Sequence, residues 1–142
     1  MSFNLYNPIL STDSYKQSHF LQTPVGTRNQ FSYIESRGGA YENTVFFGLQ
    51  HALKQYLTVP ITQSDIDEAE TFTLAHGEPF NRAGWQHILD NHNGYMPVVI
   101  KAVAEGTVVP VHNALVTVEA TDPSCAWVVS YLETMLLRAV WY

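Results

Sequence analysis

Hydrophobic and polar positions change their spacing along the chain, and these changes predict where helices and strands lie. Three segments carry apolar residues three or four positions apart, the spacing of one helical face: residues 44–57, 62–77 and 81–94. Thr62, with Asp65 three positions later, is typical of a helix start. We therefore predict three helices in the middle of the chain.

Two other regions favour strands. In residues 28–36 polar and apolar positions alternate, which places Phe31 and Tyr33 on one face. In residues 97–119 the pattern changes to β-branched runs separated by turn residues: VVIKAV, GTVVPV and ALVTVEA. These runs predict two or three strands of a sheet.

Helices are also predicted near both ends of the chain. Ser11 or Thr12 is the expected N-cap of a short helix near the N-terminus. Pro123 opens a last helix that is apolar nearly all round up to Trp141, and a helix of that kind must be buried on several sides. Because the sequence stops at Tyr142 without a polar cap, we expect the chain to be truncated at its C-terminus.

Together these elements predict an α+β fold in which four to five helices pack a small, mostly antiparallel sheet. Residues 1–142 are predicted to form a single domain. Hydrophobic residues make up 46% of the chain and charged residues only 14%, below the roughly 25% typical of soluble domains. Either this is ordinary variation, or a large interface or a missing remainder of the protein buries additional surface.

Charge and cysteine content narrow the classes of function. Seven basic and 13 acidic residues give a net charge of −6, without the basic patch that nucleic-acid binding requires. We expect no signal peptide and no membrane span, since the longest apolar segment, residues 125–142, contains Glu133 and Arg138. Cys125 is the only cysteine, which excludes an intrachain disulfide and favours a reducing, cytoplasmic setting.

Motifs for metal binding and nucleophilic catalysis are weak. His87 and His92 are five residues apart and are predicted to diverge on a helix, so we predict no metal site. Cys125 lies beside a predicted helix start, which can lower a thiol pKa, but its apolar surroundings favour a structural role. Neither a Walker loop nor a GxGxxG motif occurs.

Two further stretches each allow two interpretations. Arg37 follows a predicted strand and precedes two glycines, so it either binds a phosphate with backbone amides or belongs to an ordinary turn. Asp13 lies in the first turn of the N-terminal helix, and Tyr15 shares a helical face with His19. Asp13 and Tyr15 are either a capping residue and a core aromatic, or a hydrogen-bond acceptor beside a stacking surface.

Six motifs occur in the order in which one known family carries them. They are NPILSTDSYKQSHFLQTPVGT, FSYIESR, TVFFGLQHALKQYL, FNRAGWQHIL, GYMPVVIKAVAEGTVVPVHNALVTVEATDP and WVVSYLETMLLRAVWY. From residue 7 onward the chain thus resembles the N-terminal region of the nicotinamide phosphoribosyltransferase family. Some members carry a longer, lysine-rich insertion after the position of Arg37, which affects the placement of this arginine but not its identity.

The resemblance implies a type II phosphoribosyltransferase that joins nicotinamide to phosphoribosyl pyrophosphate, with the help of Mg²⁺, and releases nicotinamide mononucleotide and pyrophosphate. It also implies a homodimer with active sites at the subunit interface. By motif, Tyr15 is similar to the tyrosine that stacks on the pyridine ring from across the dimer, and Asp13 to the aspartate beside it. Arg37 is similar to an arginine that reaches the partner's phosphate site.

The family's catalytic α/β barrel lies C-terminal to the residues present, with the catalytic histidine and most ligands of phosphoribosyl pyrophosphate. The resemblance therefore implies that this chain supplies no catalytic residue and no metal ligand, and that it is inactive when isolated. Because the last helix is apolar nearly all round, we also expect the isolated chain to associate. Two alternatives stay open: a free-standing interaction module, and the N-terminal part of a nicotinate phosphoribosyltransferase. Ser14 and the continuation QSHF favour the nicotinamide branch.

Overall fold

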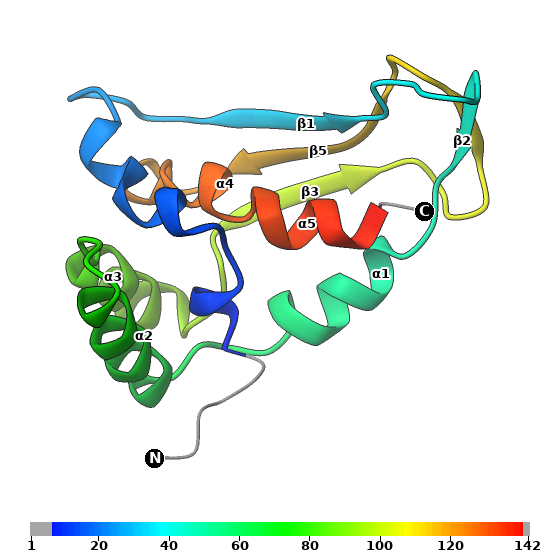
Figure 1. The fold of residues 1–142 in the computed structure, drawn as a ribbon. Helices are drawn as coiled ribbons and strands as arrows, with labels where there is room; N and C mark the ends of the chain where they lie inside the picture. The colour runs from blue at the N-terminus through cyan, green and yellow to red at the C-terminus, as the bar shows by residue number, and fades with distance from the viewer. Residues whose placement is uncertain (1–6, 141–142) are drawn as a thin grey trace.

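A computed structural model describes residues 7–140, in which helices pack two small sheets (Figure 1). Within this range the strands are β1 (Phe31–Glu35), β2 (Asn43–Val45), β3 (Val98–Ala102), β4 (Val108–Pro110) and β5 (Ala114–Ala120). The α-helices are α1 (Leu49–Ala52), α2 (Gln63–Ala75), α3 (Arg82–His92), α4 (Val128–Tyr131) and α5 (Glu133–Val140). The other helical segments are the 3₁₀ helices η1 (Pro8–Leu10), η2 (Ser14–Gln22) and η4 (Pro123–Cys125), and the π-helical segment η3 (Leu53–Leu57).

The main sheet has the strand order β1-β5-β3, and each neighbouring pair is antiparallel. Ile34 of β1 lies opposite Val116 of β5, and Val116 lies opposite Ala102 of β3. The strands β2 and β4 form a separate antiparallel pair, with Thr44 opposite Val109. The predicted α+β fold, with a small antiparallel sheet and four to five helices, is therefore confirmed for the described residues.

The main sheet is covered on one face and open on the other. Val116 and Val118 of β5 belong to the covered face, along which α4 and α5 run, and both are buried (Figure 1). Phe31 and Tyr33 share the opposite face, as their alternation predicted, and keep 59% and 58% of their surface exposed. The sheet thus presents aromatic side chains on a face that the described residues leave uncovered.

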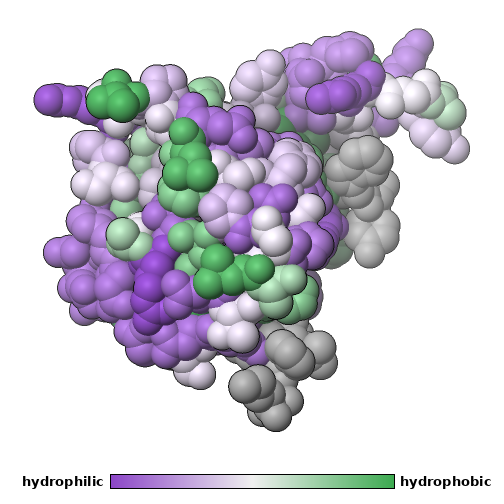
Figure 2. Space-filling model, turned by 60° about the vertical axis from the view of Figure 1, so that its left-hand side comes forward, coloured by the Kyte–Doolittle hydropathy of each residue, from purple (hydrophilic) through white to green (hydrophobic). Residues whose placement is uncertain are grey.

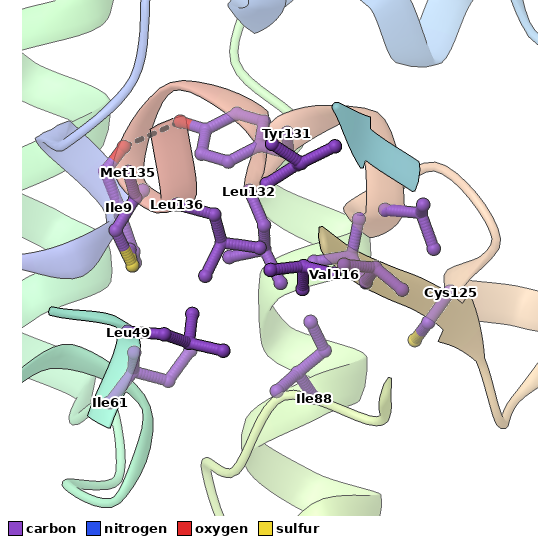
Figure 3. Close-up of a cluster of buried hydrophobic side chains, with 14 of the residues drawn as sticks. Ile9, Leu49, Ile61, Ile88, Val116, Cys125, Tyr131, Leu132, Met135 and Leu136 are labelled. Atoms are coloured by element: carbon purple, nitrogen blue, oxygen red, sulfur yellow. Dashed lines mark hydrogen bonds between the residues drawn. The ribbon is translucent and has the colours of Figure 1, made fainter. Parts of the chain in front are cut away.

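One hydrophobic cluster joins the helices to the covered face of the sheet (Figure 3). It includes a polar link, because the buried Tyr131 hydroxyl donates a hydrogen bond of 2.5 Å to the carbonyl of Ile9. This bond fastens η1 at the start of the chain to α4 near its end. The labelled members of the cluster are Ile9, Leu49, Ile61, Ile88, Val116, Cys125, Tyr131, Leu132, Met135 and Leu136.

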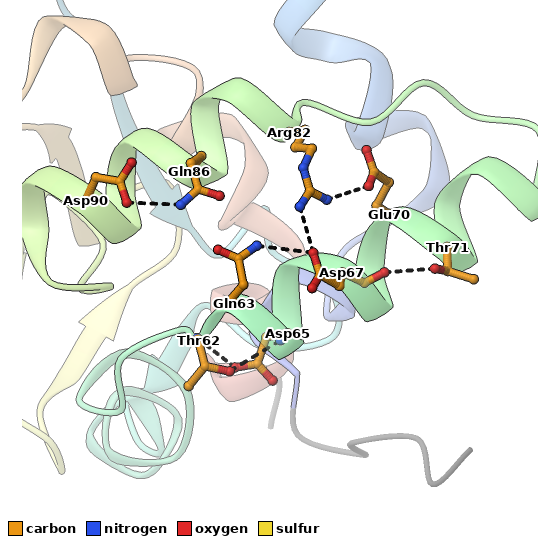
Figure 4. Close-up of polar contacts among 9 residues, drawn as sticks. All are labelled: Thr62, Gln63, Asp65, Asp67, Glu70, Thr71, Arg82, Gln86 and Asp90. Carbon is orange, nitrogen blue, oxygen red and sulfur yellow. Dashed lines mark hydrogen bonds and ion pairs between the residues drawn. The ribbon is translucent and has the colours of Figure 1, made fainter.

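Helices α2 and α3 pack against each other beside this core (Figure 1). The predicted start of α2 is confirmed: Thr62 accepts from the backbone N–H of Asp65, and the Asp65 carboxylate accepts from the N–H of Thr62 at 2.8 Å (Figure 4). Arg82 at the start of α3 pairs with Asp67, at 2.7 Å, and with Glu70 of α2. The Arg82 guanidinium holds the pKa of Asp67 below its usual range.

The first predicted helix has a different start and type from those expected. The helix is a 3₁₀ segment, and its N-cap is Asp13 rather than Ser11 or Thr12. Thr12 lies one position before this N-cap, and its hydroxyl donates to the carbonyl of Tyr131 at 3.0 Å. Tertiary contacts therefore override the local capping preference here.

The predicted helix over residues 44–57 is also only partly correct. Its first residues form β2, and the helical segments α1 and η3 begin only at Leu49. The N–H of Phe46 donates to the carbonyl of Thr107 at 3.0 Å, and the Phe46 carbonyl accepts from Gly106 at 2.8 Å. These bonds extend the β2–β4 pairing past β2, so the apolar spacing of residues 44–57 comes from two different elements.

The predicted last helix is divided into η4, α4 and α5. It is buried on several sides as expected, since Val128, Val129 and Leu132 are at most 2% exposed. Glu133 and Arg138 are its exposed charged residues. The predicted end of this helix at Trp141 lies outside the described residues.

No helix in residues 7–140 is both long and apolar enough to cross a membrane. On the face shown in Figure 2, hydrophobic residues form separate patches among polar ones. Exposed large hydrophobic residues belong to several elements and loops, and include Leu21, Val25, Tyr41, Phe47, Val59, Phe72 and Leu74.

Candidate functional site

Asp13 is held in place by α5. The Thr134 hydroxyl donates to Asp13 Oδ2 at 2.7 Å and accepts from the Asp13 backbone N–H at 3.3 Å. Asp13 makes no side-chain capping bond to its own helix. The capping interpretation of this carboxylate is therefore wrong, and its orientation is set by a residue 121 positions later.

Tyr15 lies on the surface of η2 with 52% of its area exposed, so it is not a core aromatic. His19 meets the tyrosine ring edge-on, with the ring centroids 5.3 Å apart. The Lys16 ammonium lies 5.3 Å from the centre of the same ring. The ring is thus supported by its own helix and still has surface available for stacking.

Lys16 connects η2 to the start of α5. Its side chain is only 5% exposed and forms an ion pair with Glu133. Its ammonium also lies 3.4 Å from the Ser130 hydroxyl. Neither Lys16 nor Glu133 was predicted to belong to a site, although a glutamate in an otherwise apolar helix indicates that a cation lies nearby.

Glu133→Gln is expected to lower the free energy of unfolding by about 1–2 kcal/mol, because it leaves the buried Lys16 ammonium without its anion. The effect is smaller than for a fully buried pair since the Glu133 side chain is 47% exposed. Urea denaturation followed by circular dichroism measures it, with the exposed Glu42→Gln as control. Equal stability of the two variants would show that the ion pair contributes nothing measurable.

Arg37 lies in the turn that follows β1 and is exposed. Gly38 and Gly39 have φ of 90° and 154°, so the two glycines adopt backbone conformations that other residues rarely take. Within residues 7–140 the Arg37 guanidinium has no ion-pair partner. It lines a groove of about 800 Å³ with residues of β1 and α5, among them Ile34, Glu133 and Leu136.

The structure brings Asp13 and Tyr15 together on one short segment but places Arg37 elsewhere. The blue segment with η2 lies near the beginning of β1, whereas Arg37 follows the end of that strand (Figure 1). Glu133 is the residue common to both regions, because it pairs with Lys16 and also lines the groove beside Arg37. Helix α5 therefore holds the Asp13 segment and also borders the groove that Arg37 lines.

The prediction that His87 and His92 diverge is wrong. Five helical positions separate them by about 140° around the α3 axis, but Asp122 lies within reach of both imidazoles. Each Nε2 lies 2.7 Å from the same oxygen, Asp122 Oδ2, and the ring centroids are 5.7 Å apart. The sequence pattern missed this cluster because Asp122 comes 30 positions after His92.

Asp122 and Cys125 have shifted pKa values for opposite reasons. Hydrogen bonds from His92, His87 and the Ser124 N–H hold the pKa of Asp122 well below its usual range. Burial, followed by the nearby Asp122 carboxylate, raises the pKa of the Cys125 thiol to about 12. With no cation present, the carboxylate is therefore charged and the buried thiol neutral at physiological pH.

A comparison with protein families decides the identity. The N-terminal domain family of nicotinamide phosphoribosyltransferase matches residues 7–100. The chain belongs to this family. Asp13, Tyr15 and Arg37 all lie inside the matched range, whereas Asp122 and Cys125 lie beyond it.

Individual members of the nicotinamide phosphoribosyltransferase family match most of this chain. A nicotinamide phosphoribosyltransferase of Xanthomonas campestris pv. campestris (strain 8004) is 57% identical over 138 residues, which cover 97% of this chain and 29% of that protein. One from Acinetobacter baylyi is 29% identical over 99% of this chain and 31% of that protein. One from Mycoplasma pneumoniae is 30% identical over 94% of this chain and 34% of that protein. The chain thus spans about a third or less of the length of these relatives.

Proposed function

We propose that this chain is the N-terminal, dimer-interface part of an enzyme that joins nicotinamide to phosphoribosyl pyrophosphate, yielding nicotinamide mononucleotide and pyrophosphate for NAD synthesis. The observation that carries the proposal is the 57% identity to a nicotinamide phosphoribosyltransferase over 97% of this chain. The names of all three relatives favour nicotinamide over nicotinate as the substrate. The catalytic residues are proposed to lie in the part of the enzyme that this chain does not span.

In this proposal Tyr15 covers the nicotinamide ring in the active site of the partner subunit. Its half-exposed ring supports this role, because a pyridine ring gains by stacking on an aromatic face. Asp13 is proposed to accept a hydrogen bond in the same pocket. Thr134 already donates to Asp13 Oδ2, which fixes the carboxylate and leaves Oδ1 to accept from the ligand.

Arg37 is proposed to bind a phosphate of the substrate held by the partner subunit. An exposed guanidinium without an ion-pair partner among the described residues can reach outward, and its planar fork matches phosphate oxygens. A homodimer is required for both roles, since the pocket that Tyr15 and Arg37 complete belongs to the other subunit. The buried, unpaired Cys125 supports a reducing, cytoplasmic setting.

Mg²⁺ is proposed to bind outside this part of the chain. This ion prefers an octahedral set of oxygen ligands, but Asp13 is engaged by Thr134 and Glu133 by Lys16. In residues 7–140, three or more possible metal ligands come together only in the histidine-rich cluster at Asp122. We therefore propose that Mg²⁺ enters the enzyme with phosphoribosyl pyrophosphate and makes no bond to this part of the chain.

Tyr15→Ala in the intact enzyme is expected to raise the KM for nicotinamide about fivefold or more, since stacking of one aromatic pair contributes about 1 kcal/mol. Steady-state synthesis of nicotinamide mononucleotide measures the change. Tyr15→Phe keeps the ring and should retain a KM near the wild-type value. Tyr41→Ala, at another exposed tyrosine, serves as the control for unspecific effects. An unchanged KM in Tyr15→Ala would refute the stacking role.

A further inference from the structure

Four side chains of metal-binding type converge where α3 ends and η4 begins. His87 and His92 come from α3, Asp122 is the N-cap of η4, and Cys125 is its last residue. One donor atom from each, two imidazole nitrogens, a carboxylate oxygen and a thiol sulfur, lies within 4.8 Å of the other three. We propose that these four residues form a structural Zn²⁺ site, independent of the nicotinamide pocket.

The distances are close to those of a tetrahedral site. Bond lengths of about 2.0–2.3 Å to zinc place tetrahedral ligands roughly 3.3–3.6 Å from one another. Asp122 Oδ2 lies 2.7 Å from each histidine Nε2 and 4.0 Å from Cys125 Sγ. To bind zinc, the Asp122 carboxylate oxygen therefore has to move about half an ångström away from the imidazoles. The Cys125 sulfur has to move about half an ångström closer to that oxygen, and side-chain rotation allows shifts of this size.

The four donors suit zinc in type and charge. Two imidazoles, one thiolate and one carboxylate form a mixed set that borderline ions such as Zn²⁺ and Co²⁺ bind, whereas Mg²⁺ and Ca²⁺ prefer oxygen alone. The cation displaces the thiol proton of Cys125, as zinc does with coordinating cysteines. The resulting thiolate and the Asp122 carboxylate together balance the two charges of Zn²⁺, so the site is neutral when filled.

Neighbouring groups already limit how the ligands are presented. Asp122 Oδ1 accepts from the Ser124 N–H at 2.8 Å, which leaves Oδ2 as a single donor toward the cluster. The Asn91 side-chain amide lies 3.2 Å from His87 Nδ1. When His87 Nε2 binds metal, His87 Nδ1 carries the proton. If the Asn91 amide turns over, its oxygen can accept a hydrogen bond from this Nδ1–H, but Asn91 then loses its hydrogen bond to the His87 carbonyl.

Access and burial also fit a structural ion. The His87 and His92 side chains are 34% and 30% exposed, so an ion can enter from solvent. Cys125 on the inner side is completely buried. A bound ion would fasten α3 to the segment leading into α4 and α5. A bound ion should therefore raise the free energy of unfolding of the protein without contacting the residues proposed to bind nicotinamide.

The test uses the intact protein that carries this chain, stripped of metal with a chelator under reducing conditions and titrated with Co²⁺. We expect one equivalent to bind, with the near-ultraviolet charge-transfer band of a cobalt–thiolate bond and the visible bands of tetrahedral Co²⁺. Zn²⁺ should remove both signals by displacement and raise the melting temperature. Saturating Co²⁺ without the charge-transfer band would overturn the proposal, because the Cys125 thiolate is one of the four proposed ligands.

Three variants assign the signal to the cluster. Cys125→Ser should abolish the charge-transfer band. His92→Gln, at a partly exposed position that tolerates change better, should weaken Co²⁺ binding at least about tenfold, since loss of even an indirect metal contact costs that much. His51→Gln, an exposed histidine on α1, should bind like the wild type. Equal affinities of His92→Gln and His51→Gln would refute the site even if Cys125→Ser fails to fold.

Discussion

Replacing Trp85 by alanine is expected to lower the free energy of unfolding by about 3–5 kcal/mol. Trp85 is fully buried on α3. Its ring makes edge-to-face contacts with Trp127 and Tyr131, at 4.9 Å between centroids in both cases. Alanine removes these contacts and leaves a cavity between α3 and the segment around α4, which the surrounding helices can fill only in part.

Trp85→Phe is the matched control and should cost much less. The buried Nε1–H of Trp85 has no hydrogen-bond partner among the described residues, so phenylalanine also removes an unpaired polar group. We expect a loss of about 1 kcal/mol for this variant. Urea denaturation of both proteins measures the difference. A phenylalanine variant as unstable as the alanine variant would contradict this account of the aromatic cluster.

Gly94→Ala is expected to cost about 3 kcal/mol or more, because it combines backbone strain with a clash. Gly94 has a φ of 80°, in the left-handed region. A Cβ here would lie far inside contact distance of the Ile61 carbonyl oxygen and 3.1 Å from Pro60 Cβ. The segment before α2 would then have to move, which breaks the 2.9 Å hydrogen bond from the Ile61 N–H to the Gly94 carbonyl.

Gly77→Ala separates the two causes. Gly77 has a similar φ of 89°, but a Cβ there would have no atom within 4 Å. This control should therefore lose only the backbone term of about 1 kcal/mol. The midpoints of thermal and urea unfolding give both values. If the two alanine variants are equally stable, the clash expected at Gly94 does not contribute to the loss of stability.

The sequence predicted those elements whose signals are local. The helix start predicted at Thr62 and Asp65 was correct because both residues lie in one helical turn and each accepts a hydrogen bond from the backbone N–H of the other. The alternation in β1 correctly placed Phe31 and Tyr33 on one face, but it did not show that this face is the exposed one. The helix over residues 44–57 was only partly correct, because pairing with β4 makes its first residues a strand and no local pattern reveals that partner.

For the candidate site, local sequence patterns revealed even fewer of the contacts. Tyr15 and Asp13 were identified by motif, but the sequence could not show that Thr134 holds Asp13 or that Tyr15 is exposed. The histidine cluster was missed because Asp122 lies on a separate element. In each case the deciding contact joins residues far apart in the sequence, which periodicity and spacing do not report.

The contacts that fasten the beginning of the chain to α4 and α5 also determine when this region can become ordered during synthesis. The Tyr131–Ile9 and Thr134–Asp13 hydrogen bonds span 122 and 121 residues. At about 5–20 residues per second, a ribosome needs roughly 6–24 s to make the later partner after the earlier one. The segment that carries Tyr15 therefore leaves the ribosome well before its partners in α4 and α5, and it can dock only after they have been made. During that interval it is open to chaperones and proteases.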